Sequence, residues 1–455
     1  MMDNQDIFNR GAFKHGCTAA GLMSGTSMDG VDAIIIDIWE KEENSNDVNH
    51  PRKVLSVKKH AFNCRAYPLH LKERLMNLAE GGLEGGCARE ISHLKRRLGK
   101  FYWNCLEELM SKTDIDSEDV DLVGSHGQTV YHSPGESVHT LQLDCPSILV
   151  ENSGIPAVSN FRQRDIAAGG EGAPLVPLID YLLYRREDRH RFMLNIGGIA
   201  NYTFLPAACS RSGVRGSDTG PGNMLIDAAV RRITGGVRDF DPGGEMAAGG
   251  RVSEEGIKYL FSHDFFQRPL SRSTGRSDFD SKFLNEFWKF SRRNSLSEED
   301  ILATLTAFTA RSAAKAVTQQ FKKYIDREGN PVGCGNEDCR DDKRDEISRG
   351  KKKESSIKPE IEVIVSGGGI HNRELMRKLE SEVDEACGPP VEVLKFAEAK
   401  EKHRGEFPPL GADEKEAAAF AMLAWLTSRG ESGNLPAVTG AEREVVLGNI
   451  TPVDS

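Results

Sequence analysis

The feature that most constrains this chain is a glycine-rich turn between two apolar, strand-like runs. The first run begins at Thr18, the second ends at Ile38, and SGTSMDG at 24–30 lies between them. Gly25 and Gly30 allow positive φ angles and close backbone approach. Because N–H groups and hydroxyls then gather at one tip, the turn predicts a concave site for a phosphate. An ordinary glycine hairpin would show the same pattern.

Two carboxylates belong to the same stretch. Asp29 and Asp32 would repel a phosphate, but they are suited to hold a Mg²⁺ ion, or its waters, between themselves and a nucleotide. Asp29 is the candidate metal ligand, directly or through a water. The candidate nucleotide-binding residues of this turn are Gly25, Thr26, Ser27, Met28, Asp29, Gly30, Val31 and Asp32.

A second hairpin of the same kind occurs roughly half a chain later. Apolar runs at 192–196 and 199–205 flank Gly197 and Gly198, which are further candidate nucleotide contacts. Duplicated hairpins predict two related lobes, with a nucleotide in the cleft between them, where ligand sites usually lie. The 455 residues also exceed what one core normally supports.

The composition is that of a globular protein without excess positive charge. Hydrophobic residues make up 38% of the chain, charged residues 28%, and the formal net charge is −10. Because a nucleic-acid partner needs a basic face, we expect a small-molecule substrate and no nucleic acid. No run approaches the ~20 apolar residues of a membrane span. The nine cysteines have no regular spacing, so we expect reduced thiols in the cytoplasm.

Polar residues lie where predicted strands end. His126 and Gln128 lie in a buried-looking strand at 121–132, and α/β folds place ligand contacts at the carboxyl ends of strands. A hydrogen-bonded turn histidine is the structural alternative. Arg162 and Asp165 lie beside a glycine-rich crossover. There an arginine fork can clamp an anionic or hydroxyl-rich ligand, or join an interdomain salt-bridge cluster.

Asp218 precedes a glycine–proline–glycine turn that opens a predicted helix at 224–233. The N–H groups at the start of that helix would face the same space as the carboxylate. Asp218 is therefore a candidate general base. An aspartate that caps the helix is the structural competitor.

Three features occupy the last third of the chain. The segment 326–360 is crowded with charge, glycine and serine, and it predicts a disordered insertion. A strand then runs into a triple glycine, where Gly368 and Asn372 are candidate contacts for a flat adenine ring. An alanine-rich helix at 411–426 carries Glu416 near its start, a further candidate ligand contact.

Eight motifs, in this order along the chain, resemble the anhydro-N-acetylmuramic acid kinase family. They are GLMSGTSMDGVDA (21–33), SHGQTVYH (125–132), FRQRDIAAGGEGAPLVP (161–177), NIGGIAN (195–201), DTGPGNMLIDA (218–228), STGR (273–276), SGGGIHN (366–372) and GNLPAVTGA (433–441). The likeness spans nearly the whole chain, apart from its first residues and the insertion.

The resemblance implies an α/β fold similar to actin, Hsp70 and sugar kinases, usually as a homodimer. Two lobes with ribonuclease-H-like mixed sheets would hold ATP in the cleft between them. We expect the first lobe at 16–160 with 408–455, and the second at 161–407. The family's ATP-binding segment falls on Gly25 to Asp32, and its catalytic aspartate falls on Asp218.

The implied reaction is the ATP- and Mg²⁺-dependent conversion of 1,6-anhydro-N-acetylmuramic acid and water to N-acetylmuramic acid 6-phosphate. It would belong to amino sugar metabolism and cell wall recycling. The candidate sugar contacts are His126, Gln128, Arg162, Asp165 and Glu416. One alternative is a levoglucosan kinase, which performs the same chemistry on 1,6-anhydroglucose. Another, from a different class, is an ATP-gated binding protein of the actin/Hsp70 type.

Overall fold

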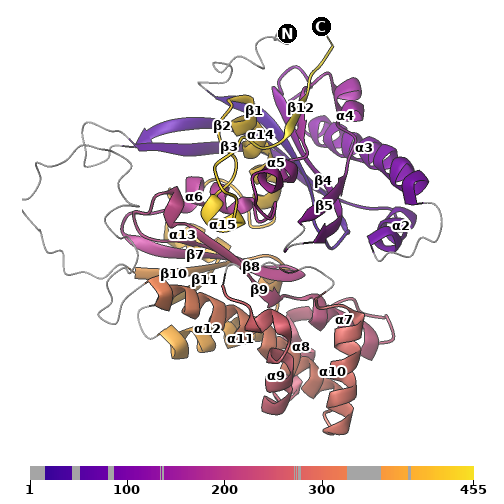
Figure 1. The fold of residues 1–455 in the computed structure, drawn as a ribbon, viewed down its shortest axis with the longest axis vertical. Helices are drawn as coiled ribbons and strands as arrows, with labels where there is room; N and C mark the ends of the chain where they lie inside the picture. Colours follow the sequence, from indigo (N-terminus) through magenta and orange to yellow (C-terminus); the bar gives the residue numbers. More distant parts are fainter. Residues whose placement is uncertain are drawn as a thin grey trace, which may run out of the picture. The chain divides into compact units, whose positions relative to one another are not determined.

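The chain divides into two compact units in the computed structural model (Figure 1). The first unit comprises the chain up to Leu183 and again from Lys402, and the second comprises Tyr184–Glu401. The model describes residues 16–43, 52–79, 87–133, 135, 138–270, 272, 274, 278–324, 360–387 and 391–454. The predicted insertion therefore lies outside the described residues, except for Glu360.

The division differs from the predicted lobe boundaries. Residues 161–183 and 402–407 were expected in the second lobe, but they belong to the first unit. The physical reason is visible at Asp165, whose carboxylate accepts hydrogen bonds from Asn434 and Thr439 in the C-terminal segment. These contacts attach the crossover to the first unit.

The first unit is built on a mixed sheet. Its described strands are β1 (Cys17–Ser24), β2 (Gly30–Glu43), β3 (Arg52–Ala66), β4 (Leu122–Ser133), β5 (His139–Leu143), β6 (Ala157–Ser159) and β12 (Asn449–Thr451). Its described helices are α2 (Leu69–Ala79), α3 (Cys87–Ser111), α4 (Pro146–Ser153), α5 (Arg162–Ala167), α6 (Val176–Tyr184), α14 (Lys415–Ser428) and α15 (Pro436–Thr439). The strand order is β12–β6–β4–β1–β2–β3, with β5 paired to β4.

The second unit repeats the central part of this topology. Its described strands are β7 (Arg189–Ile196), β8 (Ile199–Leu205), β9 (Arg215–Pro221), β10 (Glu360–Ser366) and β11 (Val391–Lys395). Its described α-helices are α7 (Met224–Ile233), α8 (Glu245–Gly249), α9 (Glu254–Phe261), α10 (Ser281–Arg293), α11 (Glu298–Tyr324), α12 (Arg373–Cys387) and α13 (Phe396–Lys402). The strand order is β11–β10–β7–β8–β9.

Both sheets follow one plan. In the first unit β1, β2 and β3 form an antiparallel meander, and β4 runs parallel to β1 and β6. In the second unit β7, β8 and β9 form the meander, and β10 runs parallel to β7 and β11. This is the order of a ribonuclease-H-like sheet. The two predicted glycine hairpins, β1–β2 and β7–β8, and the predicted α/β fold class are confirmed.

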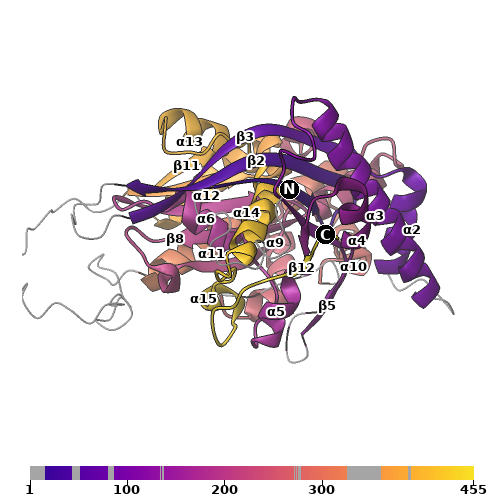
Figure 2. The ribbon, with the colours of Figure 1, turned by 90° about the horizontal axis from the view of Figure 1, so that it is seen from above.

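Helix α14 lies directly against the backbone of the first sheet (Figure 2). Side chains alternate along a strand, so Gly21 faces α14 while Ala20 and Leu22 belong to the apolar cluster that includes residues of α3. A Cβ atom at Gly21 would overlap the carbonyl oxygen of Ala417, and one at Gly124 would overlap that of Phe420. Glycine at these two positions therefore sets the distance between α14 and the strands.

This close approach predicts a stability effect. We expect Gly124→Ala to lower the free energy of unfolding by about 2–3 kcal/mol, because the added methyl group forces the strand and the helix apart. Gly249→Ala is the matched control, since a Cβ there meets no atom within 4 Å. Denaturant unfolding of both variants measures the difference. Equal midpoints would contradict the packing described here.

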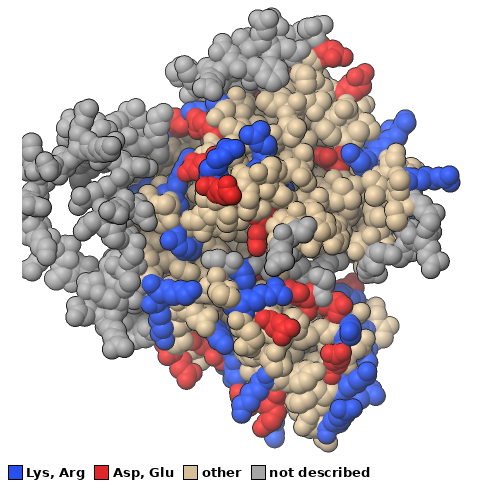
Figure 3. All heavy atoms as spheres, viewed as in Figure 1, with Lys and Arg blue, Asp and Glu red and all other residues tan. Residues whose placement is uncertain are grey.

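The surface carries both signs of charge. On the face drawn in Figure 3, acidic and basic side chains are interspersed over the described surface. In the described part of the chain, no helix has both the length and the apolar character that a bilayer span requires.

Candidate functional site

The turn between β1 and β2 is fixed at its base by side chains. Ser24 Oγ lies 2.7 Å from Gly30 O, so one hydroxyl bridges the two strand ends. Gln128 on β4 donates its amide Nε2 to Gly25 O at 3.0 Å. Gln128 is completely buried and is used to hold the turn. The sugar contact expected of Gln128 stays a prediction.

The tip of the turn presents backbone donors. Met28 has a φ of 56° and is buried in the apolar core, which anchors the tip. Among the described residues, no acceptor pairs with the backbone N–H groups of Thr26, Ser27 and Asp29. Several N–H groups of a tight turn form the kind of nest that binds phosphate. The geometry therefore fits the phosphate site expected from the sequence.

The two carboxylates at this turn differ in their partners. Asp29 accepts from Lys72 Nζ at 2.6 Å and is exposed. Burial raises the pKa of Asp32, a shift that the Cys64 thiol reduces and Asp413 increases. No group of three or more acidic, histidine or cysteine side chains that could hold a metal occurs among the described residues. Asp29 thus has a cationic partner, and Asp32 is the more buried of the two carboxylates.

His126 holds an arginine. Its Nδ1 lies 2.8 Å from Gly127 O, and its Nε2 lies 2.9 Å from Nη2 and 3.1 Å from Nε of Arg162. Burial, reinforced by Arg162, holds the pKa of His126 well below its usual value. The neutral ring therefore donates from Nδ1 and accepts at Nε2, and protein groups use both nitrogens. His126 therefore positions Arg162, and the sugar contact expected of His126 stays a prediction.

Arg162 remains a cation despite its surroundings. Burial lowers the pKa of its guanidinium to about 10, which is still well above neutral pH. Nη1 donates to Gly172 O at 2.8 Å, and the negative charges of Glu416 and Asp165 favour the cationic form of Arg162. A charge held in this way suits an anionic ligand.

Asp165 is used by the protein itself. Its carboxylate is fully buried, and Oδ1 accepts from Asn434 Nδ2 and Thr439 Oγ1, each at 2.7 Å. Oδ2 accepts from Gly172 N at 2.8 Å. Both oxygens therefore face protein donors. Asp165 thus forms a structural junction, and the sugar contact expected of it stays a prediction.

Glu416 lies in the first turn of α14. Desolvation raises the pKa of its carboxyl, a shift that Lys415 reduces and the charge of Asp32 increases. Arg162 also acts electrostatically on this group. The charges of Asp32 and Arg162 thus both influence the carboxyl of Glu416.

In the second unit, Asp218 lies on strand β9. Its Oδ2 accepts from the backbone N–H of Thr274 at 2.7 Å, and its own N–H donates to Arg272 O at 3.0 Å. The residue at the cap position of α7 is Asn223. This excludes the helix-capping alternative for Asp218. A carboxylate oriented by a backbone donor is suited to act as a base.

The β7–β8 turn packs against the start of α7. Gly222 N donates to Gly198 O, and Asn223 N donates to Gly197 O, both at 2.8 Å. A Cβ atom at Gly198 would meet nothing within 4 Å, so this side of the turn is open. Among the described residues, the N–H groups of Gly197 and Gly198 have no acceptor. The second hairpin therefore also offers backbone donors.

The triple-glycine segment lies beside the same turn. Gly367 has a φ of 82°, and Gly368 begins a short 3₁₀ helix, η4 (Gly368–His371). A Cβ atom at Gly368 would lie 3.5 Å from Asn223 Nδ2. Asn372 Oδ1 accepts from Leu375 N at 2.9 Å, which caps the start of α12. Gly368 is thus near the α7 turn, while the Asn372 side chain has a structural partner.

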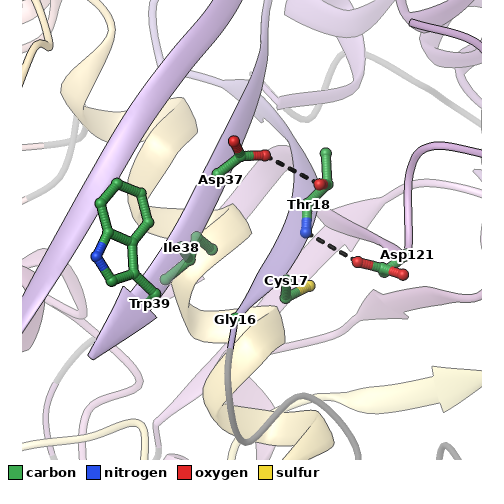
Figure 4. A pocket seen from close by; sticks show the side chains of 7 residues that line it. All are labelled: Gly16, Cys17, Thr18, Asp37, Ile38, Trp39 and Asp121. Carbon is green, nitrogen blue, oxygen red and sulfur yellow. Dashed lines mark hydrogen bonds between the residues drawn. The ribbon is translucent and has the colours of Figure 1, made fainter. Parts of the chain in front are cut away.

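A pocket of about 350 Å³ opens elsewhere in the first unit, at the start of β1 (Figure 4). Thr18 N donates to Asp121 Oδ2 and Thr18 Oγ1 donates to Asp37 Oδ1, each at 2.9 Å. The lining residues are Gly16, Cys17, Thr18, Asp37, Ile38, Trp39 and Asp121. Since the phosphate turn follows the other end of β1, roughly 20 Å away at the rise of a strand, the pocket is separate from it.

Comparison with known proteins identifies the family. The family model described as anhydro-N-acetylmuramic acid kinase matches residues 18–335 and 351–453. The chain belongs to the anhydro-N-acetylmuramic acid kinase family. It is therefore a phosphotransferase that acts on a sugar hydroxyl.

Proteins named anhydro-N-acetylmuramic acid kinase resemble the chain along most of their length. That of Shewanella putrefaciens is 36% identical over 94% of this chain and 96% of its own. Those of Salinibacter ruber and Caldanaerobacter subterraneus are 35% and 33% identical, each over 95% of this chain and 96% of the relative. A glucokinase of the ROK family from Streptomyces griseus covers 90% of this chain and 99% of its own, at 12% identity and a TM-score of 0.35. A score this low carries no inference.

The sequence analysis did not identify several residues that support the candidate site. Ser24 and Tyr67 hold the glycine turn at 24–30, and Thr274 orients Asp218. Thr274 belongs to the STGR motif, so its motif was visible in the sequence although its role was not. Tyr67 lies outside every motif and gave no signal.

Asp144 makes the free energy of unfolding of the first unit depend on pH. Burial raises the pKa of its carboxyl to about 6, although Ser125 Oγ donates to it at 3.3 Å. Because an unfolded aspartate has a pKa of about 3.9, the folded state binds this proton more tightly. The resulting stability is complete below about pH 4 and is lost as the pH rises through 6.

Asp144→Asn tests this pH-dependent contribution to stability, because the amide cannot ionise. We expect the variant to match the wild type near pH 4 and to exceed it by about 2–3 kcal/mol at pH 8. Urea unfolding at both pH values measures the difference, with the exposed Asp114→Asn as control. A difference that is independent of pH would contradict the burial of an ionisable carboxyl.

Proposed function

We propose that the chain is an ATP-dependent kinase that opens 1,6-anhydro-N-acetylmuramic acid with water and phosphorylates O6. One observation carries the proposal: Asp218 lies on a strand, does not cap the helix, and has its carboxylate oriented by the Thr274 N–H. In a kinase family, an oriented carboxylate of this kind supports a base that activates a nucleophile.

The substrate's chemistry explains why that nucleophile is water. A 1,6-anhydro sugar has no free 6-hydroxyl, so a base has no sugar proton to remove there. Asp218 accepts a proton from water, whose oxygen bonds to C1 while the C1–O6 bond breaks. O6 takes that electron pair and attacks the γ-phosphorus in line, and the bond to ADP breaks. The proton on Asp218 then returns to solvent.

The glycine turns would bind the nucleotide. The unpaired N–H groups of Thr26, Ser27 and Asp29, with those of Gly197 and Gly198, support phosphate binding without side-chain charge. Asp32 would hold the Mg²⁺ ion, which supplies positive charge to the phosphates when bound. The backbone near Gly368 would contact the adenine ring of the nucleotide.

Arg162 favours the muramic acid substrate over levoglucosan. Muramic acid carries a lactyl carboxylate, whereas 1,6-anhydroglucose carries no anionic group. A guanidinium fixed by His126 and Gly172 supports recognition of an anion. Glu416 would accept hydrogen bonds from sugar hydroxyls.

The reaction is tested with purified protein, ATP, Mg²⁺ and each anhydro sugar in ¹⁸O-labelled water. We expect turnover with 1,6-anhydro-N-acetylmuramic acid, little with levoglucosan, and solvent oxygen at C1 only. Label in the phosphate would overturn the mechanism, and a preference for levoglucosan would overturn the assigned sugar. ATP turnover stimulated by neither sugar would favour the binding-protein alternative.

Three further expectations belong to this proposal. One is a role in cell wall recycling. Another is a cytoplasmic location, which accords with the thiols Cys17, Cys64, Cys105 and Cys145, none of which forms a disulfide. A homodimer is the assembly that the resemblance implies. Light scattering of the purified protein measures it.

A further inference from the structure

A network of buried hydroxyls links the core of the first unit to the phosphate turn. Tyr102 OH lies 3.4 Å from Tyr67 OH, which lies 2.9 Å from Ser24 Oγ. Ser24 Oγ lies 2.7 Å from Gly30 O and 2.7 Å from Gln128 Oε1. All four side chains are buried, so water does not replace these partners. We call Tyr102, Tyr67, Ser24 and Gln128 the hydroxyl network.

The directions of these hydrogen bonds follow from a count of hydrogens. Gln128 Nε2 lies 3.0 Å from Gly25 O and 3.1 Å from the carbonyl oxygen of the next residue, so both amide hydrogens are used. Oε1 therefore accepts from Ser24. Ser24 has one hydroxyl hydrogen, for which Gln128 Oε1 and Gly30 O compete. Because Ser24 has no second hydrogen, Tyr67 must be the donor to Ser24 Oγ.

The network orients a peptide of the turn. The peptide between Gly25 and Thr26 is planar and trans, so its C=O and its N–H point in opposite directions. Gln128 holds the C=O towards β4, and the Thr26 N–H must therefore point away from β4. Tyr67 makes a second contact with the turn, since its backbone N–H donates to Asp29 O at 2.9 Å.

We propose that Tyr67 is a positioning residue for nucleotide binding. Its hydroxyl fixes Ser24, Ser24 fixes the Gln128 amide, and that amide holds the turn so that the Thr26 N–H is oriented before a phosphate arrives. The inference rests on the proposed function for the identity of the ligand, a nucleoside triphosphate. Donors that are already oriented strengthen binding because less ordering accompanies it.

Tyr67→Phe tests the inference, because it removes one hydroxyl and keeps the ring that packs against Phe101. Calorimetry with ATP and Mg²⁺, without sugar, should show a Kd raised roughly 5- to 20-fold, the loss expected when a buried hydrogen bond is removed. The KM for the anhydro sugar should stay unchanged. Ser24→Ala, which breaks the network next to the turn, should weaken ATP binding at least as much and serves if Tyr67→Phe does not fold.

Two matched variants locate the effect. Tyr102→Phe removes a hydroxyl one step further from the turn, and we expect a smaller rise in Kd than for Tyr67→Phe. Tyr131→Phe removes an exposed hydroxyl outside the network, and we expect no change. Wild-type ATP affinity in Tyr67→Phe, or equal losses for ATP and for sugar, would overturn the inference. Wild-type protein that binds no ATP would overturn the proposed function and the inference with it.

Discussion

Asp218→Asn should lower kcat by roughly 10³-fold while leaving the affinity for ATP unchanged, because general-base catalysis typically contributes 10²- to 10⁴-fold. The amide keeps an oxygen that can accept from the Thr274 N–H, so the local backbone contact survives the substitution. What is lost is the ability to take a proton from water. ADP release in the presence of the anhydro sugar measures the rate, and calorimetry measures ATP binding.

The exposed Asp239→Asn is the control for this prediction, since it removes one negative charge from the same unit. We expect it to retain wild-type kcat. Activity of Asp218→Asn within about threefold of the wild type would show that another group takes the proton. A loss of ATP binding together with activity would indicate that Asp218 is needed for the fold of the unit.

Local patterns were sufficient for much of the fold. Alternation of apolar residues on either side of a glycine turn predicted both hairpins, and the start of α7 at Met224 followed from its turn. These features depend on residues close in sequence, whose backbone preferences are visible in the chain itself. The duplicated sheet could be predicted from the two hairpins, because each hairpin begins an antiparallel meander with the same strand order.

The roles of individual polar residues were less predictable. Gln128 meets Gly25 across 103 positions, and Asp165 meets Asn434 across 269. The periodicity of apolar residues does not indicate partners that are distant in sequence. A buried residue that bonds to the protein and a residue that contacts a ligand therefore cannot be distinguished from the sequence. The same long-range contacts of Asp165 explain why the boundary after 160 was predicted too early. The position of Asp218 was more predictable, because the glycine–proline–glycine turn after it left two roles, a general base or a helix cap.

The two units hold their glycine turns by different means. In the first unit a buried side-chain amide, Gln128, accepts and donates beneath the turn. In the second unit the backbone of the α7 turn donates directly to Gly197 O and Gly198 O. A side-chain support is sensitive to a single substitution, whereas a backbone support is not. The first turn should therefore be the more easily weakened of the two by mutation.

Glu362→Ala should destabilise the second unit by about 3–5 kcal/mol, because it leaves a buried charge without its partner. Arg191 is fully buried, and its Nε donates to Glu362 Oε2 at 2.8 Å. The two residues are neighbours in the register of β7 and β10. Arg189 also contacts Glu362 but keeps Asp188 at 2.6 Å, so the substitution acts mainly on Arg191, whose Nε loses the Glu362 carboxylate.

Hydrogen exchange of peptides from β7 and β10 measures this effect within the second unit, without assuming that both units unfold together. The double variant Arg191→Met/Glu362→Leu is the matched control, because it removes both charges and keeps apolar volume. We expect it to recover most of the lost protection, since replacing a buried ion pair by packed apolar side chains is often neutral. If the double variant were no more stable than Glu362→Ala, lost packing and not the loss of the Arg191–Glu362 ion pair would be the cause.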